Sequence, residues 1–352
     1  MKMKTLLITF GILLLLAAIA CAVLCHPAFG LLRKHTTNVE QSANWRNGQF
    51  RNQVPTPQFT GNTSMVLTMW KFLTERGNSR FPSDTIRALK TDLNSIPTDS
   101  DWTVWFGHSS YLFCVGGMRV LVDPVLKLEF PASLMLKPFA GTDIYRPEDI
   151  PDIDLLIITH EHWDHMDYAT LRDIRQRVKR VVCPLGIADY LIHWGYQPDI
   201  IFELDWYDVC QPISPMTVTC LPSRHFSNRL ITRNQTLWAS FMVENNGRKV
   251  YVGGDGGYDK RFSEIRENFG QVDLAFLENG QYNDNWAFIH TTPADLEKVI
   301  IDLDAKQVFT VHHDKFALAQ HAWNEPDSVA HSIAAKHTIN LLDQPIGTVV
   351  KF

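Results

Sequence analysis

The chain begins with a continuous apolar run. Residues Thr5 to Cys25 include no charged side chain, and Lys2 and Lys4 precede them. As a helix, this run would measure roughly 31 Å, which matches the hydrocarbon core of a bilayer. The apolar part of a cleavable signal peptide is usually shorter, about 7–15 residues. The pattern therefore favours a retained membrane anchor over a signal segment within residues 1–30.

The processing and the orientation of this segment are less strongly specified. Ala18-Ile19-Ala20-Cys21 is similar to a lipoprotein cleavage site, although the first position of such a site is usually a larger aliphatic residue. The amino group and the two lysines before the run slightly outnumber Arg33 and Lys34 after it. By the positive-inside rule, the rest of the chain is expected on the outer side of the inner membrane, in the cell envelope.

The pattern after the apolar run predicts two further regions. Residues 31–98 contain scattered prolines and little periodicity, which predicts an extended arm with one short helix at Met65–Arg76. Residues 99–352 are predicted to form one domain. In this region, short strand-like runs come first, and strand-like runs then alternate with helical spacing.

The expected elements follow from this alternation. Early strands are expected at Trp102–Phe106, Tyr111–Val115, Arg119–Val122 and Asp154–Thr159. Later strands are expected at Arg180–Cys183, Asp199–Leu204, Met216–Leu221, Leu237–Glu244, Arg248–Gly253, Val272–Leu277 and Gln307–Val311. Helices are expected at Met166–Val178, Leu185–Trp194, Phe262–Phe269, Pro293–Leu303 and Pro326–Lys336. This order predicts an α/β structure with layered sheets and helices outside.

Composition and charge narrow the range of functions. Hydrophobic residues make up 45% and charged residues 20% of the chain, which is typical of a globular protein with a sizeable core. The formal net charge of −5 argues against a nucleic-acid partner. The six cysteines include no CxxC pair, which favours buried free thiols over a disulfide framework.

The strongest chemical signal is a histidine-rich loop directly after the apolar run that ends at Thr159. It holds His160, His162, Asp164 and His165 within six residues. In an extended chain, the side chains two residues apart point the same way, and a turn can send the next pair towards a second point. Zinc binds imidazole nitrogen and carboxylate oxygen. The loop therefore predicts a two-metal site, and a solvated polar loop is the weaker interpretation.

One loop cannot fill two metal shells, so further ligands are expected at strand ends. His225 follows one expected strand, and His312 and His313 follow another. Asp255 follows a third, between Gly-Gly pairs that allow the backbone to approach an ion closely. A carboxylate at that position can bridge both metals.

These motifs together resemble the metallo-β-lactamase superfamily and, within it, the N-acylphosphatidylethanolamine-hydrolysing phospholipase D family with its bacterial relatives. The resemblance covers about residues 101–316. The matching stretches are Trp105-Phe106-Gly107-His108-Ser109-Ser110, Leu121-Val122-Asp123-Pro124, Thr159 to Asp167, Glu203-Leu204-Asp205-Trp206, Pro222-Ser223-Arg224-His225, Gly254-Asp255-Gly256-Gly257-Tyr258 and Val311-His312.

The resemblance implies a four-layer αββα sandwich and a zinc-dependent hydrolase with two Zn²⁺ per chain. It implies that His160, His162 and His225 hold one zinc, that Asp164, His165 and His312 hold the other, and that Asp255 bridges them. Asp164, Asp255 and His290 are the expected catalytic residues. His290 matches a substrate-proximal histidine, and His108 is expected near the substrate by its strand position.

The sequence departs from the family in two places. Gly256 stands where a Ser or Thr often follows the bridging aspartate. The stretch His312-His313-Asp314-Lys315-Phe316 replaces His-Trp-Gly-Thr-Phe. Both changes keep the expected ligands but alter the expected pocket wall.

The expected reaction is phosphodiester hydrolysis of phospholipase D type on a membrane phospholipid, by a hydroxide held between the metals. Leu126–Ala140 is apolar and could line a lipid groove, touch a membrane or pack on the core. One alternative is a zinc hydrolase of the same fold that acts on a lactone, a β-lactam or another phosphodiester. Another is a non-catalytic zinc-binding envelope protein. Other divalent metals remain open, because His/Asp sites accept several.

Overall fold

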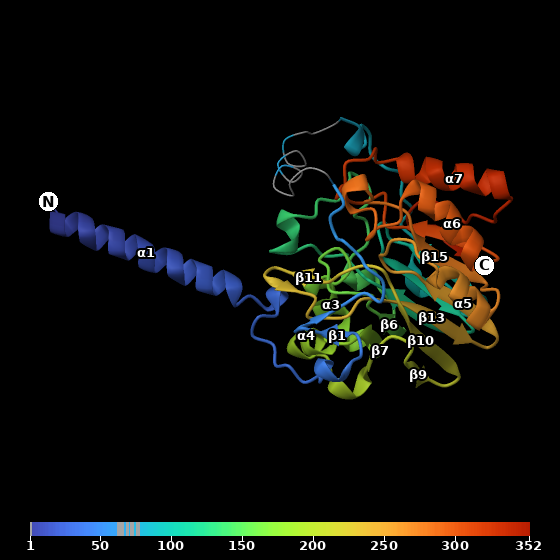
Figure 1. The fold of residues 1–352 in the computed structure, drawn as a ribbon, viewed down its shortest axis with the longest axis horizontal. Helices are drawn as coiled ribbons and strands as arrows, with labels where there is room; N and C mark the ends of the chain where they lie inside the picture. The colour runs from blue at the N-terminus through green and yellow to red at the C-terminus, as the bar shows by residue number, and fades with distance from the viewer. Residues whose placement is uncertain (1, 62–66, 68–69, 71–73, 75–77) are drawn as a thin grey trace.

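The structure is a computed structural model that describes residues 2–61, 67, 70, 74 and 78–352. The helix expected at Met65–Arg76 lies largely outside the described residues. Helix α1 (Lys2–Leu24) extends away from the rest of the chain (Figure 1). Of the helices in the described ranges, α1 is long and apolar enough to cross a membrane, over Thr5–Leu24, and this span is not buried against the domain.

Two sheets form the centre of the domain. The first has the strand order β17-β3-β4-β5-β6-β7-β8 and the second β16-β15-β14-β13-β10-β9. The first comprises β3 (Trp102–Trp105), β4 (Tyr111–Val115), β5 (Met118–Val122), β6 (Ile153–Ile157), β7 (Val178–Pro184), β8 (Ile201–Leu204) and β17 (Val349–Lys351). The second comprises β9 (Val209–Ile213), β10 (Met216–Pro222), β13 (Ala239–Asn245), β14 (Arg248–Val252), β15 (Leu274–Glu278) and β16 (Val308–Val311).

The two sheets pack face to face, with helices on both outer surfaces. Tyr111 of the first sheet stacks on Phe276 of the second with ring centroids 3.9 Å apart. Helices α3 (Tyr168–Ile174) and α4 (Ala188–His193) cover the outer face of the first sheet. Helices α5 (Arg261–Phe269), α6 (Pro293–Leu303) and α7 (Glu325–His337) cover the second. The predicted four-layer αββα sandwich is therefore confirmed.

Alternation along the strands explains why each sheet buries both faces. On β5, Val120 and Val122 belong to the core between the sheets, whereas Leu121 packs under the helices. On the neighbouring β6, Leu155 and Ile157 likewise face the core between the sheets, whereas Ile153 and Leu156 pack under the helices. This pattern is typical of strands covered on both sides.

Some elements differ from the sequence prediction. The helix expected at Met166–Val178 ends as α3 at Ile174, followed by a 3-10 turn, because β7 begins at Val178. The helix expected from Leu185 begins only at Ala188, after Gly186 in a left-handed conformation. Strands β9 and β17 were not predicted. The same holds for two short hairpins, β1 (Trp45–Arg46) with β2 (Gln49–Phe50) and β11 (Asn228–Arg229) with β12 (Thr232–Arg233).

The topology brings several loops to one edge of the sandwich. Strands β5, β6 and β7 are parallel, and β3 runs in the same direction because two antiparallel pairings separate it from β5. In the second sheet, β14, β15 and β16 are parallel, and β10 has the same direction by the same argument. The loops after these strands carry the expected ligands, and ligands bind at the carboxyl ends of strands in such sheets.

Candidate metal centre

The histidine-rich loop is fixed by a buried aspartate at its two ends. Asp123, directly after β5, accepts hydrogen bonds from the Thr159 backbone (2.8 Å) and hydroxyl (2.5 Å) where the loop begins. It also accepts one from His165 Nδ1 (2.8 Å) where the loop ends. No role was predicted for Asp123 from the sequence. Its signal was its place at a strand end, which it shares with Asp255.

Three histidine nitrogens converge on the first side of the centre. His162 Nδ1 lies 2.9 Å from His160 Nε2 and 3.2 Å from His225 Nε2. With a carboxylate oxygen of Asp255, these atoms lie within 4.8 Å of one another. The structure thus brings together the residues expected to hold one ion.

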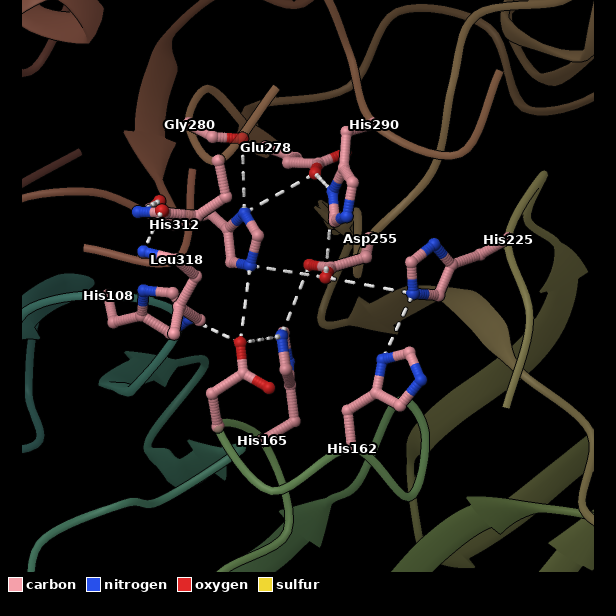
Figure 2. A network of polar contacts seen from close by, with 12 residues as sticks. His108, His162, His165, His225, Asp255, Glu278, Gly280, His290, His312 and Leu318 are labelled. Carbon is pink, nitrogen blue, oxygen red and sulfur yellow. Dashed lines mark hydrogen bonds and ion pairs between the residues drawn. The ribbon is translucent and has the colours of Figure 1, made fainter. Parts of the chain in front are cut away.

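The second side joins Asp164, His165 and His312. Asp164 Oδ2 lies 3.7 Å from His165 Nε2 and 3.5 Å from His312 Nε2. Asp255 stands between the two sides, as Figure 2 shows. Its carboxylate oxygens lie 3.2 Å from His165 Nε2, 3.1 Å from His312 Nε2 and 3.9 Å from the Nε2 atoms of His160 and His225. This position is the one that a bridging ligand requires.

The hydrogen bonds of the rings test whether these residues fit a metal. In four histidines Nδ1 has a protein partner, which leaves Nε2 for the centre. The partners are Thr159 Oγ1 for His160, Asp123 for His165, the Ile289 carbonyl for His225 and the Gly280 carbonyl for His312. Metal-binding histidines are oriented in this way. Among the described residues, His165 Nε2, His312 Nε2 and Asp255 Oδ1 are buried without a hydrogen bond. The residues therefore fit a pair of cations.

Burial and charge divide the histidines into two kinds. Burial lowers the pKa of His225 to about 4, and burial together with neighbouring histidines lowers the pKa of His160 and His162 well below its usual value. Burial also acts on His165, but Asp255 and Asp164 outweigh it and raise its pKa to about 10. The pKa of Asp255 is held well below its usual value, because His165 and His312 outweigh its burial. Cations at the centre would displace the protons from histidines whose pKa is raised, such as His165.

Glu278, at the end of β15, contacts two histidines of the site, His290 and His312. Its buried carboxylate contacts His290 Nδ1, lies 3.3 Å from His312 Nδ1 and accepts a hydrogen bond from the Gly256 backbone (2.8 Å). The neighbouring His290 outweighs the effect of burial and lowers the pKa of Glu278. Sequence reasoning missed this residue. A lone carboxylate that ends the apolar strand Leu274–Glu278 was the available signal.

Two residues singled out in the sequence, His108 and His313, lie outside the two groups of expected metal ligands. His108 is fully buried and donates from Nε2 to Asp164 Oδ2 (2.8 Å), so it contacts an expected ligand. Burial and the neighbouring His312 lower its pKa to about 3. His313 points away from the centre, and its ring packs on Trp105 with centroids 4.9 Å apart.

The arm before the domain takes part in the site. Asn52 donates to the His225 carbonyl (2.7 Å) and accepts from the His225 backbone nitrogen (3.2 Å). Further upstream, Thr36 binds Asp189 of α4 through its backbone nitrogen (2.8 Å) and hydroxyl (2.7 Å). The arm therefore fixes the loop that carries one expected ligand.

Glu278→Gln should lower turnover about 10- to 100-fold, the usual effect of losing a partner that orients a metal-binding histidine. Glutamine keeps the shape but removes the charge that orients the rings of His290 and His312. Metal per chain and kcat should be measured together. Glu267→Gln, on the exposed face of α5, is the matched control. Wild-type turnover and metal retention in Glu278→Gln would contradict this role.

A pocket with a volume of about 460 Å³ opens over the centre. Its floor includes His162, Asp164, His290 and His312. Its wall combines apolar side chains with polar ones and one arginine: Phe59, Phe226, Trp286, Ile289, Leu318, Gln58, Asn228, Gln281 and Arg233.

Comparison with known proteins agrees with this geometry. The family described as "Beta-lactamase superfamily domain" matches residues 118–313. An uncharacterized protein of Mycobacterium tuberculosis is 35% identical over 297 residues, which cover 82% of this chain and 78% of that protein. An N-acyl-phosphatidylethanolamine-hydrolyzing phospholipase D of Caenorhabditis elegans is 28% identical over 265 residues, which cover 68% of this chain and 73% of that protein.

A solved structure supports the same fold. The diiron β-hydroxylase CmlA from Streptomyces venezuelae has a TM-score of 0.56 and 19% identity, covering 72% of this chain and 54% of that chain. At this identity the likeness shows the fold alone. The chain therefore belongs to the metallo-β-lactamase superfamily, as a metal-dependent hydrolase with a dinuclear metal site.

Proposed function

We propose that this hydrolase is a zinc-dependent phosphodiesterase of phospholipase D type, which acts on membrane lipids similar to N-acylphosphatidylethanolamine. The observation that carries the proposal is the pocket. It places Arg233 and the expected metal ligands beside an apolar wall of Phe59, Phe226 and Leu318. A phosphodiester with acyl chains needs a cation for its charge and apolar surface for its chains.

The proposed roles follow from the contacts. His160, His162 and His225 would hold one zinc, Asp164, His165 and His312 the other, and Asp255 both. When bound, the ions supply Lewis acidity and lower the pKa of water at the site. Asp123 and His108 orient these ligands through hydrogen bonds, and Glu278 does so through its carboxylate, which lies 3.3 Å from His312 Nδ1.

His290 is the proposed substrate-facing residue. It lines the pocket, and its Nδ1 contacts the Glu278 carboxylate. This contact fixes the ring orientation and leaves Nε2 for a phosphoryl oxygen or a leaving-group oxygen. Arg233 can donate two hydrogen bonds to the phosphate in a planar fork.

Helix α1 completes the proposal. Its span of Thr5–Leu24 has the length and composition of a membrane anchor, and it is not packed against the domain. We propose that it holds the catalytic domain at the surface of a membrane in the cell envelope, on the outer side of the inner membrane. A lipid substrate then lies within reach without leaving the bilayer.

The first experiment measures metal and reaction in one preparation. The full chain is purified in lipid nanodiscs, because residues after α1 contact the domain and should be retained. Zinc, iron and manganese are counted per chain, and phosphatidic acid release from N-acylphosphatidylethanolamine is assayed. About two zinc ions per chain with phosphatidic acid release would support the proposal. Two metals with lactone or β-lactam hydrolysis and no phosphatidic acid would replace it with the alternative reaction on the same fold.

Arg233→Met should separate charged from neutral substrates. We expect kcat/KM for a phosphodiester to fall about 10- to 100-fold, since a charge-assisted hydrogen bond is worth about 1.5–3 kcal/mol. Hydrolysis of a neutral lactone, where detectable, should stay within about two-fold, because it offers no charge to pair. Arg180→Met, at a β7 position away from the pocket lining, is the control. Equal loss on both substrates would contradict a phosphate contact by Arg233.

A further inference from the structure

An apolar surface lies where α1 joins the domain. We call it the apolar rim and define it as Phe130, Leu134, Met135, Leu230 and Ile231. The side chains are 40%, 69%, 54%, 41% and 76% exposed. The first three belong to the loop after β5, and the last two form the tip of the β11–β12 hairpin. An exposed apolar patch of this kind typically marks a binding surface.

The residues after α1 connect the two parts of the rim. The His26 ring lies 5.6 Å from the Phe130 ring, and the Phe29 ring lies 6.3 Å from it. Arg229, on the hairpin, donates from Nε to the Ala28 carbonyl (2.7 Å). The chain that leaves α1 therefore contacts both the loop and the hairpin. Figure 1 shows α1 and β11 on the same side of the domain.

The connection to α1 is also short. Helix α1 ends at Leu24, and His26 already packs on the rim. Two residues span at most about 7 Å. If α1 crosses a bilayer, the rim is held at the surface of that bilayer.

The tip of the β11–β12 hairpin is apolar although it is exposed to solvent. Leu230 adopts a φ of 60°, in the left-handed region. Two-residue hairpin turns normally place Gly, Asn or Asp at such positions, because a larger side chain is strained there. Here the turn is Leu230-Ile231, and both side chains are exposed. These exposed apolar side chains gain free energy on entering an apolar phase.

The charges and the pocket near the rim fit the same partner. Lys34 follows the segment that packs on the rim, and Lys137 follows its loop, and both are exposed. Basic residues beside an apolar surface bind anionic headgroups. Asn228 and Arg233, on the same hairpin as the tip, line the pocket over the metal centre.

We propose that the apolar rim docks into the bilayer that α1 spans, so that the pocket opens at the level of the lipid headgroups. This docking rests on the membrane anchor in the proposed function, but not on the identity of the substrate. Leu230 and Ile231 enter the acyl region, and Arg233 stays at the phosphate level.

The test uses a fluorophore in the full chain. A single environment-sensitive dye is attached through Leu134→Cys, with Cys21, Cys25 and Cys210 replaced by Ser and the other cysteines left buried. The protein is placed in phosphatidylcholine–phosphatidylglycerol nanodiscs whose acyl chains are brominated or not. We expect bromine to reduce the emission by at least roughly two-fold, because the dye lies in the acyl region. The same dye through Ile301→Cys, at an exposed position of α6, should be unaffected.

A second variant tests the hairpin. Leu230→Gly with Ile231→Asn installs a favoured turn, so the domain should keep its fold and thermal stability. Quenching of the dye at position 134 should fall by more than about half in this variant, since the rim loses its inserted tip. Unquenched dye at position 134 in the parent chain would overturn the docking. Unchanged quenching in the hairpin variant would overturn the role of the tip. Both readouts are independent of catalysis, so a failure of the proposed reaction would leave them interpretable.

Discussion

Asp255→Asn should reduce kcat at least about 10³-fold, or roughly 4 kcal/mol, which is the scale of losing one preorganised charge at a reacting centre. The carboxylate of Asp255 lies between both groups of ligands, at 3.2 Å from His165 Nε2 and 3.1 Å from His312 Nε2. Asparagine keeps the shape and removes the charge. Its amide group would also face two nitrogens that point at the centre, so the metal content should fall from about two ions to one or fewer.

The measurement pairs steady-state kinetics with metal analysis of the same sample. Asp199→Asn, at an exposed position before β8, is the matched control and should keep both values. Thermal unfolding of both variants shows whether the fold is retained. Full metal content and turnover in Asp255→Asn would refute the bridging position and, with it, the arrangement of the dinuclear centre.

Arg229→Met should destabilise the domain by about 3–5 kcal/mol, since each orphaned buried carbonyl costs about 1–3 kcal/mol. Arg229 is fully buried and donates to the carbonyls of Ala28 (2.7 Å), Glu161 (2.7 Å) and Met166 (3.1 Å). Its guanidinium carbon also lies 3.8 Å from the centroid of the Trp163 ring. Burial lowers its pKa to about 10, so it remains charged at neutral pH.

The effect should extend to the metals, because Glu161 and Trp163 lie within the histidine-rich loop. Denaturant unfolding measures the stability, and zinc titration of the metal-free protein measures the affinity. Arg233→Met changes the same residue type four positions away, at an exposed site, and should cost less than about 0.5 kcal/mol. Equal stability of the two variants would show that Arg229 does not hold the loop.

The central part of the fold was predictable because local signals agree there. The apolar run before the histidine-rich loop gave β6, and the helical spacing after it gave α3. Strands β10, β14 and β16 end shortly before His225, Asp255 and His312 and place them at one edge. The resemblance to a known family then suggested how these ligands divide between two ions, and the distances group them in the same way. The ligand roles themselves stay a prediction.

Other elements carry little local signal. Strand β9 contains Pro212, which usually argues against a strand, and it is tolerated because β9 is an edge strand. The β11–β12 hairpin has two residues in each strand and an apolar turn. Strand β9 and the β11–β12 hairpin therefore depend on tertiary contacts more than on the local pattern of hydrophobic and polar residues.

Supporting residues were hard to predict for a similar reason. Glu278 and Asp123 look like ordinary strand-end carboxylates until the loops that they hold are in place. Arg229 stands in a polar stretch, and only the folded chain shows that it is buried. His312 and His313 are adjacent, and only the folded chain shows that His312 faces the centre while His313 packs on Trp105.

The hydrogen bond between Arg229 and Ala28 joins residues 201 positions apart. During synthesis, Ala28 therefore leaves the ribosome long before Arg229, its partner on the hairpin. In a chain anchored as proposed, the growing domain is tethered to the membrane but free to turn about its linker. When Arg229 closes onto Ala28, this freedom ends, and the catalytic face acquires a fixed orientation towards the lipid. The domain would thus take up its orientation at the membrane late in biogenesis. This step would belong to the folding of the domain and not to the insertion of α1.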